Sequence, residues 1–316
     1  MQKAILLYNP ASGRRHHRRE ADVEIAAGVL RAAGVEVVVS ETLGTTRTAV
    51  QVSQQIADGC DAVIACGGDG TIHDVLQGLV GTGAALGVIP LGTANSLAKD
   101  LGLPASPAAA ARALLAAKPR HIAVGHILCK GASGESISRY FTVTAGIGAD
   151  AEVFSNLSAN HKRRLGHAAY YVEATRLLLT HPFHRFKAQF KETGKSQVQD
   201  VQIENAEVTQ LLAVRIRNFG GLLRELAPGA SLERNDLRLV LFRTRGRWTI
   251  LSYALRAALN GKWNVPGVDL AFADSVICEP LPGSPSPIFV EADGEPLGTL
   301  PAEISVVRDA LTLLMP

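Results

Sequence analysis

Long uncharged apolar runs, cysteine pairs and aromatic residues are all scarce in this sequence. No stretch approaches the roughly 18–20 apolar residues that span a bilayer, so any membrane contact is expected at the surface. The four cysteines include no C-x-x-C pair, which argues against a zinc knuckle or a disulfide framework and favours a reducing cytosol. Aromatic residues form 5% of the chain, too few for the stacking surface of a single-strand nucleic-acid binder. We therefore expect a cytoplasmic protein without a nucleic-acid partner.

The overall composition is that of a packed protein with more than one core. The chain has 316 residues, of which 47% are hydrophobic and 19% are charged. This length favours two domains, and this balance is typical of globular rather than disordered chains. The net charge of +3 suits contact with phosphate groups or with an anionic membrane.

The first 125 residues alternate strand and helix patterns. Apolar strands are predicted at residues 3–8, 35–40, 61–66 and 86–91, and helices at residues 20–33, 49–58, 95–102 and 107–117, with one more that begins at residue 72. Buried strands that alternate with helices form a parallel sheet covered on both faces. We therefore expect a doubly wound α/β nucleotide-binding domain over residues 1–125, with ligands at the carboxyl ends of its strands.

A second domain is expected over residues 126–316. Short runs rich in β-branched and aromatic residues are separated here by Gly, Pro and Asn, which is typical of antiparallel sheet. Two helices are predicted within this part, at residues 167–179 and 248–261. We expect a mainly antiparallel β domain that takes the substrate, and we allow for its last residues to pack back on the first domain.

Glycine-bearing turns follow three of the predicted parallel strands, at Asn9–Gly13, Gly67–Thr71 and Gly92–Asn95. Glycines let successive backbone N–H groups point inward and bind an anion, and a following helix N-terminus adds partial positive charge. Asp69 would repel a phosphate unless a divalent cation such as Mg²⁺ bridges the two. The alternative is a tight turn in which Asp69 caps a helix, and Thr93 is likewise predicted as a helix cap. The three turns are expected to converge at one edge of the sheet.

Two carboxylates flank Gly294 near the end of the chain, on Asp293 and Glu295. One interpretation is an ordinary Asp-Gly hairpin with both carboxylates in water. The other is that one carboxylate fixes the loop while the second faces a cleft and takes a proton from a hydroxyl nucleophile. Upstream, Gly146–Asp150 lacks the third glycine of a dinucleotide-binding fingerprint and is expected to be a loop.

Three segments are candidates for contact with a membrane. Arg14–Arg19 and Lys162–Arg164 are basic, and the helix over Trp248–Leu259 has an apolar face. The alternatives are a solvated charge run for Arg14–Arg19 and a core helix for Trp248–Leu259.

Taken together, the motifs resemble one family. The diacylglycerol-kinase catalytic family has, in this order and spacing, segments similar to "NPASG", "GGDGTIHDVLQGL", "PLGTANSLAKDLG", "AGIGADAEV", "LGHAAYYVEATRLLL" and "VEADGEPLG". The resemblance covers nearly the whole chain and is to bacterial soluble lipid kinases, with sphingosine and ceramide kinases as more distant relatives. It implies an α/β nucleotide domain and a β-rich second domain, with ATP in the cleft between them.

The resemblance also implies roles for individual residues. Glu295 matches the proton acceptor of the family, and Asp69 is a second catalytic candidate that holds Mg²⁺ together with ATP. The positions expected to contact ATP are Asn9, Pro10, Ala11, Ser12, Gly13, Thr42, Gly67, Gly68, Asp69, Gly70, Thr71, Ile72, His73, Thr93 and Asn95.

Two departures from the family pattern stand out. Ser96 follows Asn95 where the family usually has Asp. A structural Mg²⁺ site of the family maps to Leu232, Asn235 and Leu237, and Asn235 replaces its aspartate. A neutral Asn oxygen is a much weaker ligand for a hard cation than a carboxylate is, and the adjacent Asp236 is an alternative ligand.

The function expected from these features is phosphorylation of a lipid alcohol with ATP and Mg²⁺, first of all diacylglycerol to phosphatidic acid. The expected partners are ATP and a membrane lipid met at the inner face of the membrane, and the resemblance allows a homodimer. One alternative is phosphorylation of a soluble nucleotide, as in NAD kinases, which share the GGDGT motif. Another is a catalytically weakened regulator that binds lipid or nucleotide, for which Asn235 is the support.

Overall fold

The computed structural model describes residues 1–10, 18–156, 173, 175–178, 180–191, 205–220, 225–261, 263–284 and 287–316. They form two compact units, of which unit 1 comprises Met1–Ala123 and Arg308–Pro316, and unit 2 comprises Val124–Val307. Strands β5 (Lys118–Lys130) and β15 (Glu295–Met315) each begin in one unit and end in the other. Most of the helix expected at residues 167–179 lies outside the described residues.

Unit 1 is built on a parallel sheet. Its strands are β1 (Lys3–Tyr8), β2 (Glu36–Glu41), β3 (Ala62–Gly67) and β4 (Ala85–Pro90), and they lie in the order β2-β1-β3-β4. The end of β15 adds a further parallel strand beside β4, with Thr312 opposite Ala85. The helices are α1 (Arg19–Ala32), α2 (Thr45–Ala57), α3 (Asp69–Leu79), α4 (Ser96–Asp100) and α5 (Pro107–Ala116).

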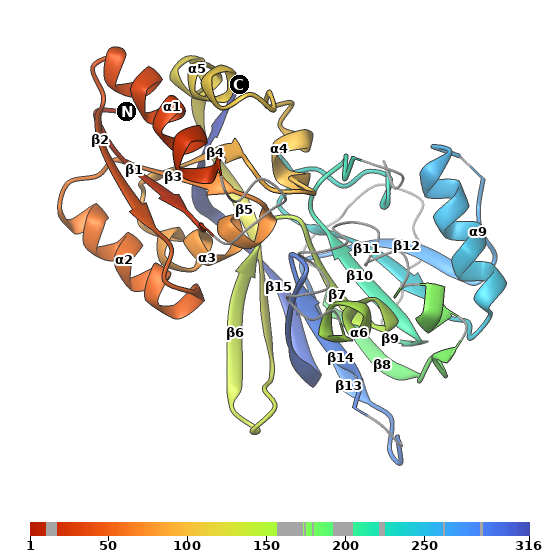
Figure 1. Cartoon of the computed structure of the whole chain (residues 1–316). Coiled ribbons are helices and arrows are strands. Elements are labelled where there is room, and N and C mark those ends of the chain that lie inside the picture. Colours follow the sequence, from red (N-terminus) through yellow and green to blue (C-terminus); the bar gives the residue numbers. More distant parts are fainter. Residues whose placement is uncertain are drawn as a thin grey trace. The chain divides into compact units, whose positions relative to one another are not determined.

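Helices cover both faces of this sheet. Side chains alternate along each strand, so Leu6 and Ile64 face α1 and α5, with which they share one buried cluster. Figure 1 shows α1 and α5 on one face of the sheet and α2 and α3 on the other. Strands β1, β3 and β4 are apolar at nearly every position, as expected where both faces of a strand are buried. The predicted doubly wound α/β architecture is confirmed.

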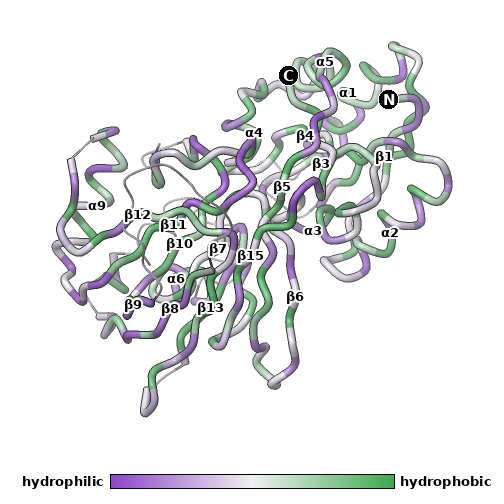
Figure 2. Tube along the Cα trace, turned by 180° about the vertical axis from the view of Figure 1, so that it is seen from behind, coloured by the Kyte–Doolittle hydropathy of each residue, from purple (hydrophilic) through white to green (hydrophobic). Residues whose placement is uncertain are grey.

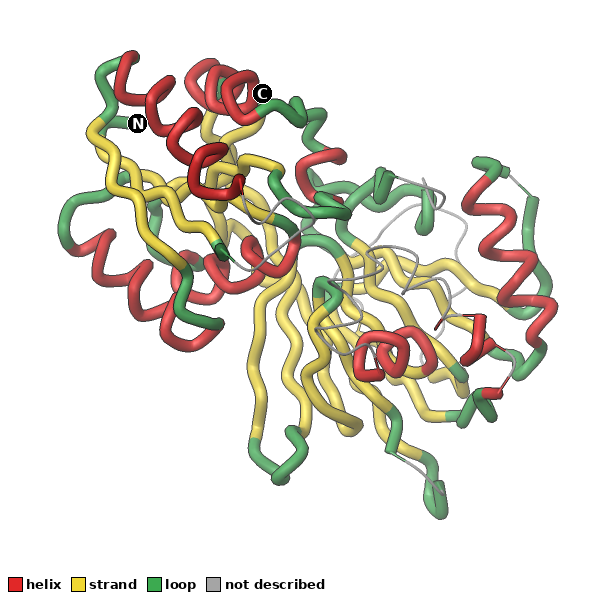
Figure 3. The backbone as a smooth tube through the Cα atoms, in the orientation of Figure 1, coloured by secondary structure: helices red, strands yellow, loops and turns green. Residues whose placement is uncertain are grey.

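Unit 2 is mainly antiparallel β structure, as predicted (Figure 3). One path of paired strands runs β12-β11-β10-β7-β14-β15, while β13 joins β15 to β8 and β9, and β5 pairs with β6. The remaining strands and helices are β6 (Ser136–Phe141), β7 (Thr144–Gly148), α6 (Ala149–Asn156), β8 (Phe186–Lys191), β9 (Asn205–Val208), β10 (Gln210–Val214), β11 (Leu237–Phe242), α9 (Arg247–Ala258), β12 (Val268–Ala273), β13 (Ser275–Pro280) and β14 (Phe289–Ala292).

The segment Gly146–Asp150 is not the loop expected from the sequence. It contains the end of β7 and the first two residues of α6. The pairing of β7 with both β10 and β14 explains the difference, because partners far along the chain supply the hydrogen bonds of this strand. The packing at Gly146 leaves no room for a side chain, because an added Cβ would lie 2.8 Å from Oε1 of Glu291 on the neighbouring strand β14.

Candidate active site

The carboxyl edge of the unit 1 sheet gathers several residues expected to contact ATP. Tyr8 lies opposite both Glu41 and Cys66, so the next residue along each strand lies at one level: Asn9 after β1, Thr42 after β2, and Gly67 at the end of β3. The strand order reverses direction at β1 and β3, and such switch points are where α/β sheets bind ligands. Three of the other expected contacts, Ala11, Ser12 and Gly13, lie outside the described residues.

Two glycine turns pack directly against each other at this edge. A Cβ added to Gly92 would lie 2.3 Å from Cα of Gly68, and one added to Gly67 would lie 2.2 Å from Oγ1 of Thr71. The backbone N–H groups of Leu91 and Gly92 both donate to the carbonyl of Gly67, at 2.9 and 3.1 Å. The two turns approach each other so closely that Gly92 cannot be replaced by a larger residue without a clash. Backbone hydrogen bonds hold the turns together.

The carboxylate of Asp69 links these turns by capping a helix. Its Oδ1 accepts hydrogen bonds from the backbone N–H groups of Ser96 at 2.8 Å and Leu97 at 3.4 Å. The capped helix is α4, whereas the alternative considered from the sequence was a cap in the turn that Asp69 itself belongs to. An anionic acceptor at the positive end of a helix is favourable, so the carboxylate is held in a defined position.

The second turn owes its shape to Asn95 rather than Thr93. Asn95 is the N-cap residue of α4 and adopts the left-handed conformation with φ of 52°. Its side chain accepts from the N–H of Gly92 at 2.9 Å and donates to the carbonyl of Gly92 at 3.0 Å. The prediction that Thr93 caps the helix is therefore wrong, because a left-handed position favours Asn over a β-branched residue.

The other expected ATP contacts lie in or beside the first turn of α3. Gly70, Thr71, Ile72 and His73 all belong to this helix, and the last three side chains are buried. The side chains of Ile72 and His73 thus contribute to the core, and the part of this segment suited to an anion is the helix N-terminus.

Arg19 is a residue of this edge that the sequence did not single out. It belongs to the basic run Arg14–Arg19, which was interpreted as a membrane contact or a solvated charge run, yet its side chain is buried and Nη1 donates to the carbonyl of Leu91 at 2.5 Å. Burial lowers the pKa of its guanidinium. A buried cation beside the Gly92 turn adds positive potential where phosphates are expected.

In unit 2, the turn between β14 and β15 carries the expected proton acceptor. Glu295 is half-buried and pairs with Ala292 across the turn. Asp293 is buried, has φ of 51°, and accepts from the backbone N–H groups of Thr142, Val143 and Thr144 at 2.9–3.1 Å. The two carboxylates therefore differ in their contacts: Asp293 fixes the turn to residues 142–144, where β7 begins.

Glu291 is a second fully buried carboxyl of this turn. Its Oε2 accepts from the N–H of Gly294 at 2.7 Å, while Oε1 faces the space above Gly146 that Oδ2 of Asp150 also borders. Burial, and then the charge of Asp150, raise the pKa of Glu291 well above its usual value. The protonated, neutral form of Glu291 is therefore favoured up to a higher pH than in an exposed glutamate.

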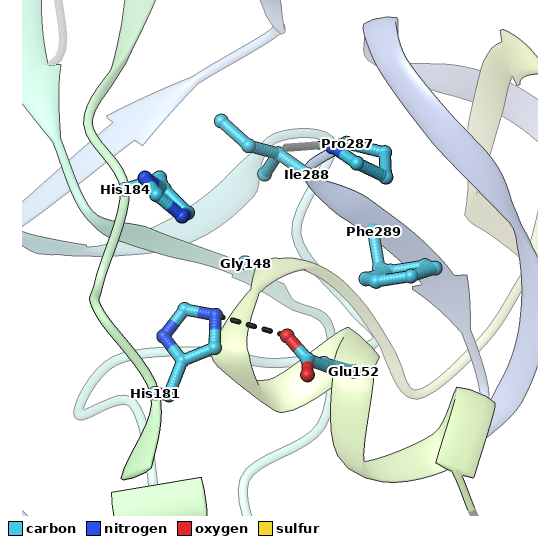
Figure 4. Close-up of a pocket in the computed structure, with 7 residues that line it drawn as sticks. All are labelled: Gly148, Glu152, His181, His184, Pro287, Ile288 and Phe289. Atoms are coloured by element: carbon cyan, nitrogen blue, oxygen red, sulfur yellow. Dashed lines mark ion pairs between the residues drawn. The ribbon is translucent and has the colours of Figure 1, made fainter. Parts of the chain in front are cut away.

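A small hollow in unit 2 brings together residues that the sequence did not connect. It is lined by Gly148, Glu152, His181, His184, Pro287, Ile288 and Phe289 (Figure 4). Nε2 of His181 lies 3.0 Å from Oε2 of Glu152, and its Nδ1 accepts from the N–H of Phe183 at 2.8 Å. Burial lowers the pKa of His181, so the neutral ring with its proton on Nε2 is favoured.

The expected structural Mg²⁺ ligands lie in and beside the loop before β11, in contact with a buried arginine. Nη1 of Arg215 donates to the carbonyl of Asp236 at 2.6 Å, and Nη2 donates to the carbonyl of Leu232 at 3.4 Å. The carboxylate of Asp236 makes two hydrogen bonds with Arg234, at 2.6 and 2.7 Å. Among the described residues, no three acidic, His or Cys side chains are grouped as a metal site would need.

Comparisons with known proteins agree across the chain. Residues 3–127 match the family model described as "Diacylglycerol kinase catalytic domain", and residues 142–315 match "YegS C-terminal NAD kinase beta sandwich-like domain". A "Diacylglycerol kinase" of Mycobacterium tuberculosis is 31% identical, covering 99% of this chain and 95% of the relative. A "Probable lipid kinase YegS-like" of Pseudomonas aeruginosa is 30% identical over 95% of this chain and 92% of the relative.

A solved structure agrees in fold. The crystal structure of a diacylglycerol kinase from Bacillus anthracis superposes with a TM-score of 0.69 at 18% identity, covering 100% of this chain and 97% of the other. At this identity the likeness concerns the fold alone. The described residues include no helix that is long and apolar enough to cross a membrane.

Proposed function

The chain belongs to the family of the diacylglycerol kinase catalytic domain, and from this membership we propose that it transfers the γ-phosphate of ATP to the hydroxyl of a lipid alcohol. The proposed substrate is diacylglycerol and the product phosphatidic acid. The substrate would be met at the inner face of the membrane, with unit 1 binding ATP and unit 2 taking the lipid.

One observation carries this proposal: the packing of the Gly67–Gly68 turn against Gly92 at the switch point of the unit 1 sheet. Close approach excludes side chains from this contact, and α3 begins directly after it at Asp69, so the N-terminus of α3 is the part of the edge proposed to receive phosphate oxygens. Asp69 is fixed by the N–H of Ser96, and buried Arg19 supplies positive charge nearby. Phosphoryl transfer depends on such positioning and charge neutralisation more than on covalent chemistry.

Each step of the proposed reaction is assigned to particular groups. The hydroxyl oxygen of the lipid attacks the γ-phosphorus, the bond from this phosphorus to the β-phosphate oxygen breaks, and ADP leaves. Glu295 accepts the hydroxyl proton, and Asp293 and Glu291 hold the turn from which Glu295 projects. Mg²⁺, when bound with ATP, neutralises phosphate charge, and Asp69 is the carboxylate proposed to orient that complex.

Substitution of Glu295 by Gln tests this assignment. The change keeps the shape of the side chain and removes its basicity, so turnover should fall at least about a hundredfold while the affinity for Mg-ATP is kept. Glu303→Gln is the matched control, because Glu303 is another half-buried glutamate of β15. Transfer of labelled phosphate to diacylglycerol in mixed micelles gives turnover, and calorimetry gives the affinity. Near-normal turnover in Glu295→Gln would remove Glu295 as the base.

The choice of acceptor needs a panel of substrates. The purified chain with Mg-ATP should phosphorylate diacylglycerol faster than monoacylglycerol, sphingosine or NAD. Preference for NAD would favour the soluble-nucleotide alternative. Binding of ATP and lipid without any turnover would favour the regulator.

A further inference from the structure

The outer face of α9 exposes an uninterrupted row of large apolar side chains. Trp248 is 81% exposed, and Leu251, Leu255 and Leu259 follow at spacings of three and four residues, which is one face of a helix. Trp263, just beyond the helix, is also exposed. We call these five residues the docking face. In Figure 2 the trace of α9 alternates between hydrophobic and hydrophilic residues, as expected of a helix with apolar stripes.

The fold of unit 2 does not need this face. The helix is held by its opposite side, where Tyr253 is buried in a cluster with Leu212 and Phe242, and Ile250 packs against the same cluster. The hydroxyl of Tyr253 donates to the carbonyl of Leu226 at 2.7 Å. The helix is therefore apolar on two sides, whereas a surface helix of a globular protein has one apolar stripe. Contiguous exposed apolar groups of this kind mark interaction surfaces.

The charge around the docking face identifies the partner. From Leu237 to Val268 the chain has no Asp or Glu, and of its five Arg in this range two, Arg238 and Arg256, are buried while the other three are exposed. Arg245 and Arg247 are exposed at the start of α9, and Arg243 pairs with Asp269. An amphipathic helix with Trp and Leu on one face and cations beside it is the pattern that binds the interface of an anionic bilayer. A second copy of the chain is disfavoured, because a stable dimer interface uses about 20–30 residues a side.

We propose that the docking face and the two flanking arginines bind the surface of a membrane that contains anionic lipid. This proposal rests on the proposed function in one respect: a lipid substrate in a bilayer explains why the protein would bind a membrane. Trp248 and the three leucines enter the acyl boundary, and Arg245 and Arg247 contact the phosphates of the headgroups.

Both tryptophans of the chain lie on the docking face, so fluorescence reports on it directly. The full chain is mixed with vesicles of phosphatidylcholine and with vesicles that also contain phosphatidylglycerol, without ATP or diacylglycerol. We expect a blue shift on the anionic vesicles, quenching by brominated acyl chains, and loss of binding as salt is raised. An unshifted, unquenched spectrum would overturn the proposal. Because no substrate is present, this result is independent of whether the chain is a kinase.

Matched variants assign the binding to the docking face. Leu251→Ser with Leu255→Ser should lower vesicle partitioning at least about tenfold. The control is Ile25→Ser with Val50→Ser, which changes two residues that are 51% and 54% exposed on other helices. Equal losses in both pairs would overturn the proposal. So would unchanged partitioning combined with dissociation of a dimer, which would assign the face to a second copy.

The arginines are tested in the same way. Arg245→Gln with Arg247→Gln should lower partitioning to anionic vesicles about twenty-five-fold, roughly fivefold for each charge, and leave phosphatidylcholine binding unchanged. Arg47→Gln with Arg112→Gln removes two exposed arginines elsewhere and should change neither. Equal sensitivity to both pairs would mean that net charge, and not this face, directs binding.

A second inference comes independently from the loop 231–237. A structural cation held by the carbonyl of Leu232 would compete with the guanidinium of Arg215, which is fully buried and already donates to that carbonyl. The same guanidinium donates to the carbonyl of Asp236 at 2.6 Å, so a permanently cationic side chain already occupies this group of carbonyls. Asn235 brings no charge to offset a second cation, and the carboxylate of Asp236 is bound by Arg234.

We infer that the guanidinium of Arg215 takes the place of the structural Mg²⁺ of the family, and that the loop is stable without metal. In the absence of nucleotide, the melting temperature of the full chain should be the same in Mg²⁺ and in EDTA. A lower value in EDTA that Mg²⁺ restores would overturn this inference. Arg215→Leu with Asn235→Asp should be less stable than the natural chain and should regain stability on addition of Mg²⁺.

Discussion

Replacing Asp293 by Ala is the sharpest test of how the turn before β15 is held. The carboxylate accepts three backbone N–H groups, from Thr142, Val143 and Thr144, at 2.9–3.1 Å. A hydrogen bond to a charged group contributes about 1.5–3 kcal/mol, but three donors that share one carboxylate are not additive. With the strain of Ala at a φ of 51°, roughly 1 kcal/mol, we expect a loss of about 4–5 kcal/mol.

Two further variants separate hydrogen bonding from backbone strain. Asp293→Asn keeps an acceptor oxygen and suits the left-handed conformation, so it should cost only about 1–2 kcal/mol. Asn260→Ala is the control for strain, because Asn260 has φ of 49° and is exposed, and it should cost about 1 kcal/mol. Both residues belong to unit 2, which also contains both tryptophans.

The free energy of unfolding of unit 2 is measured by urea titration followed by tryptophan fluorescence, with hydrogen exchange as a local probe. In Asp293→Ala the amides of residues 142–144 should lose protection, while those of β10 keep it as long as unit 2 is folded. If Asp293→Ala costs no more than Asn260→Ala, or if these amides stay protected, the reasoning from the three hydrogen bonds is refuted.

Three other predictions concern a buried acid, a glycine contact and the thiols. Because burial raises the pKa of Glu291, the folded chain releases this proton at a higher pH than the unfolded chain does, so stability should fall as pH rises above about 4.3. Glu291→Gln lacks this loss, and its stability relative to the natural chain in urea titrations should increase with rising pH. Gly92→Ala places a Cβ 2.3 Å from Cα of Gly68 and should weaken Mg-ATP binding at least tenfold by calorimetry (roughly 1.4 kcal/mol), whereas Gly28→Ala, with open space at its Cβ, should not. All four cysteines are buried and burial raises the pKa of each thiol, so a thiol reagent should label them only after unfolding.

The elements of unit 1 could be predicted because their signals are local. Continuous apolar strands such as β1 and β3 and the turns after them lie within a few residues, and the resulting parallel sheet determines which strand ends meet. The contacts that shape the candidate site are not local. Asp69 caps a helix 27 residues away, and Asp293 binds backbone 149–151 residues away.

Burial was the second property that the sequence could not supply. Arg19 looked like part of a solvated basic run, and its burial depends on the carbonyl of Leu91 in a turn far along the chain. The helix over Trp248–Leu259 had apolar residues on more than one side, and its pattern alone left a core helix as an alternative. Only the packing of Tyr253 and Ile250 decides which side is inward.

The path of β15 has a consequence for the order in which the protein can fold during synthesis. Unit 1 is completed by Arg308–Pro316, and β4 pairs with β15 through Ala85 and Leu86. Domains emerging from the ribosome generally fold from the N-terminus onward. Here the first unit to emerge keeps β4 as an open sheet edge until the whole second unit has been made. A nascent or truncated chain therefore presents that edge to other strands, and chaperone dependence during translation is expected to be greatest over this interval.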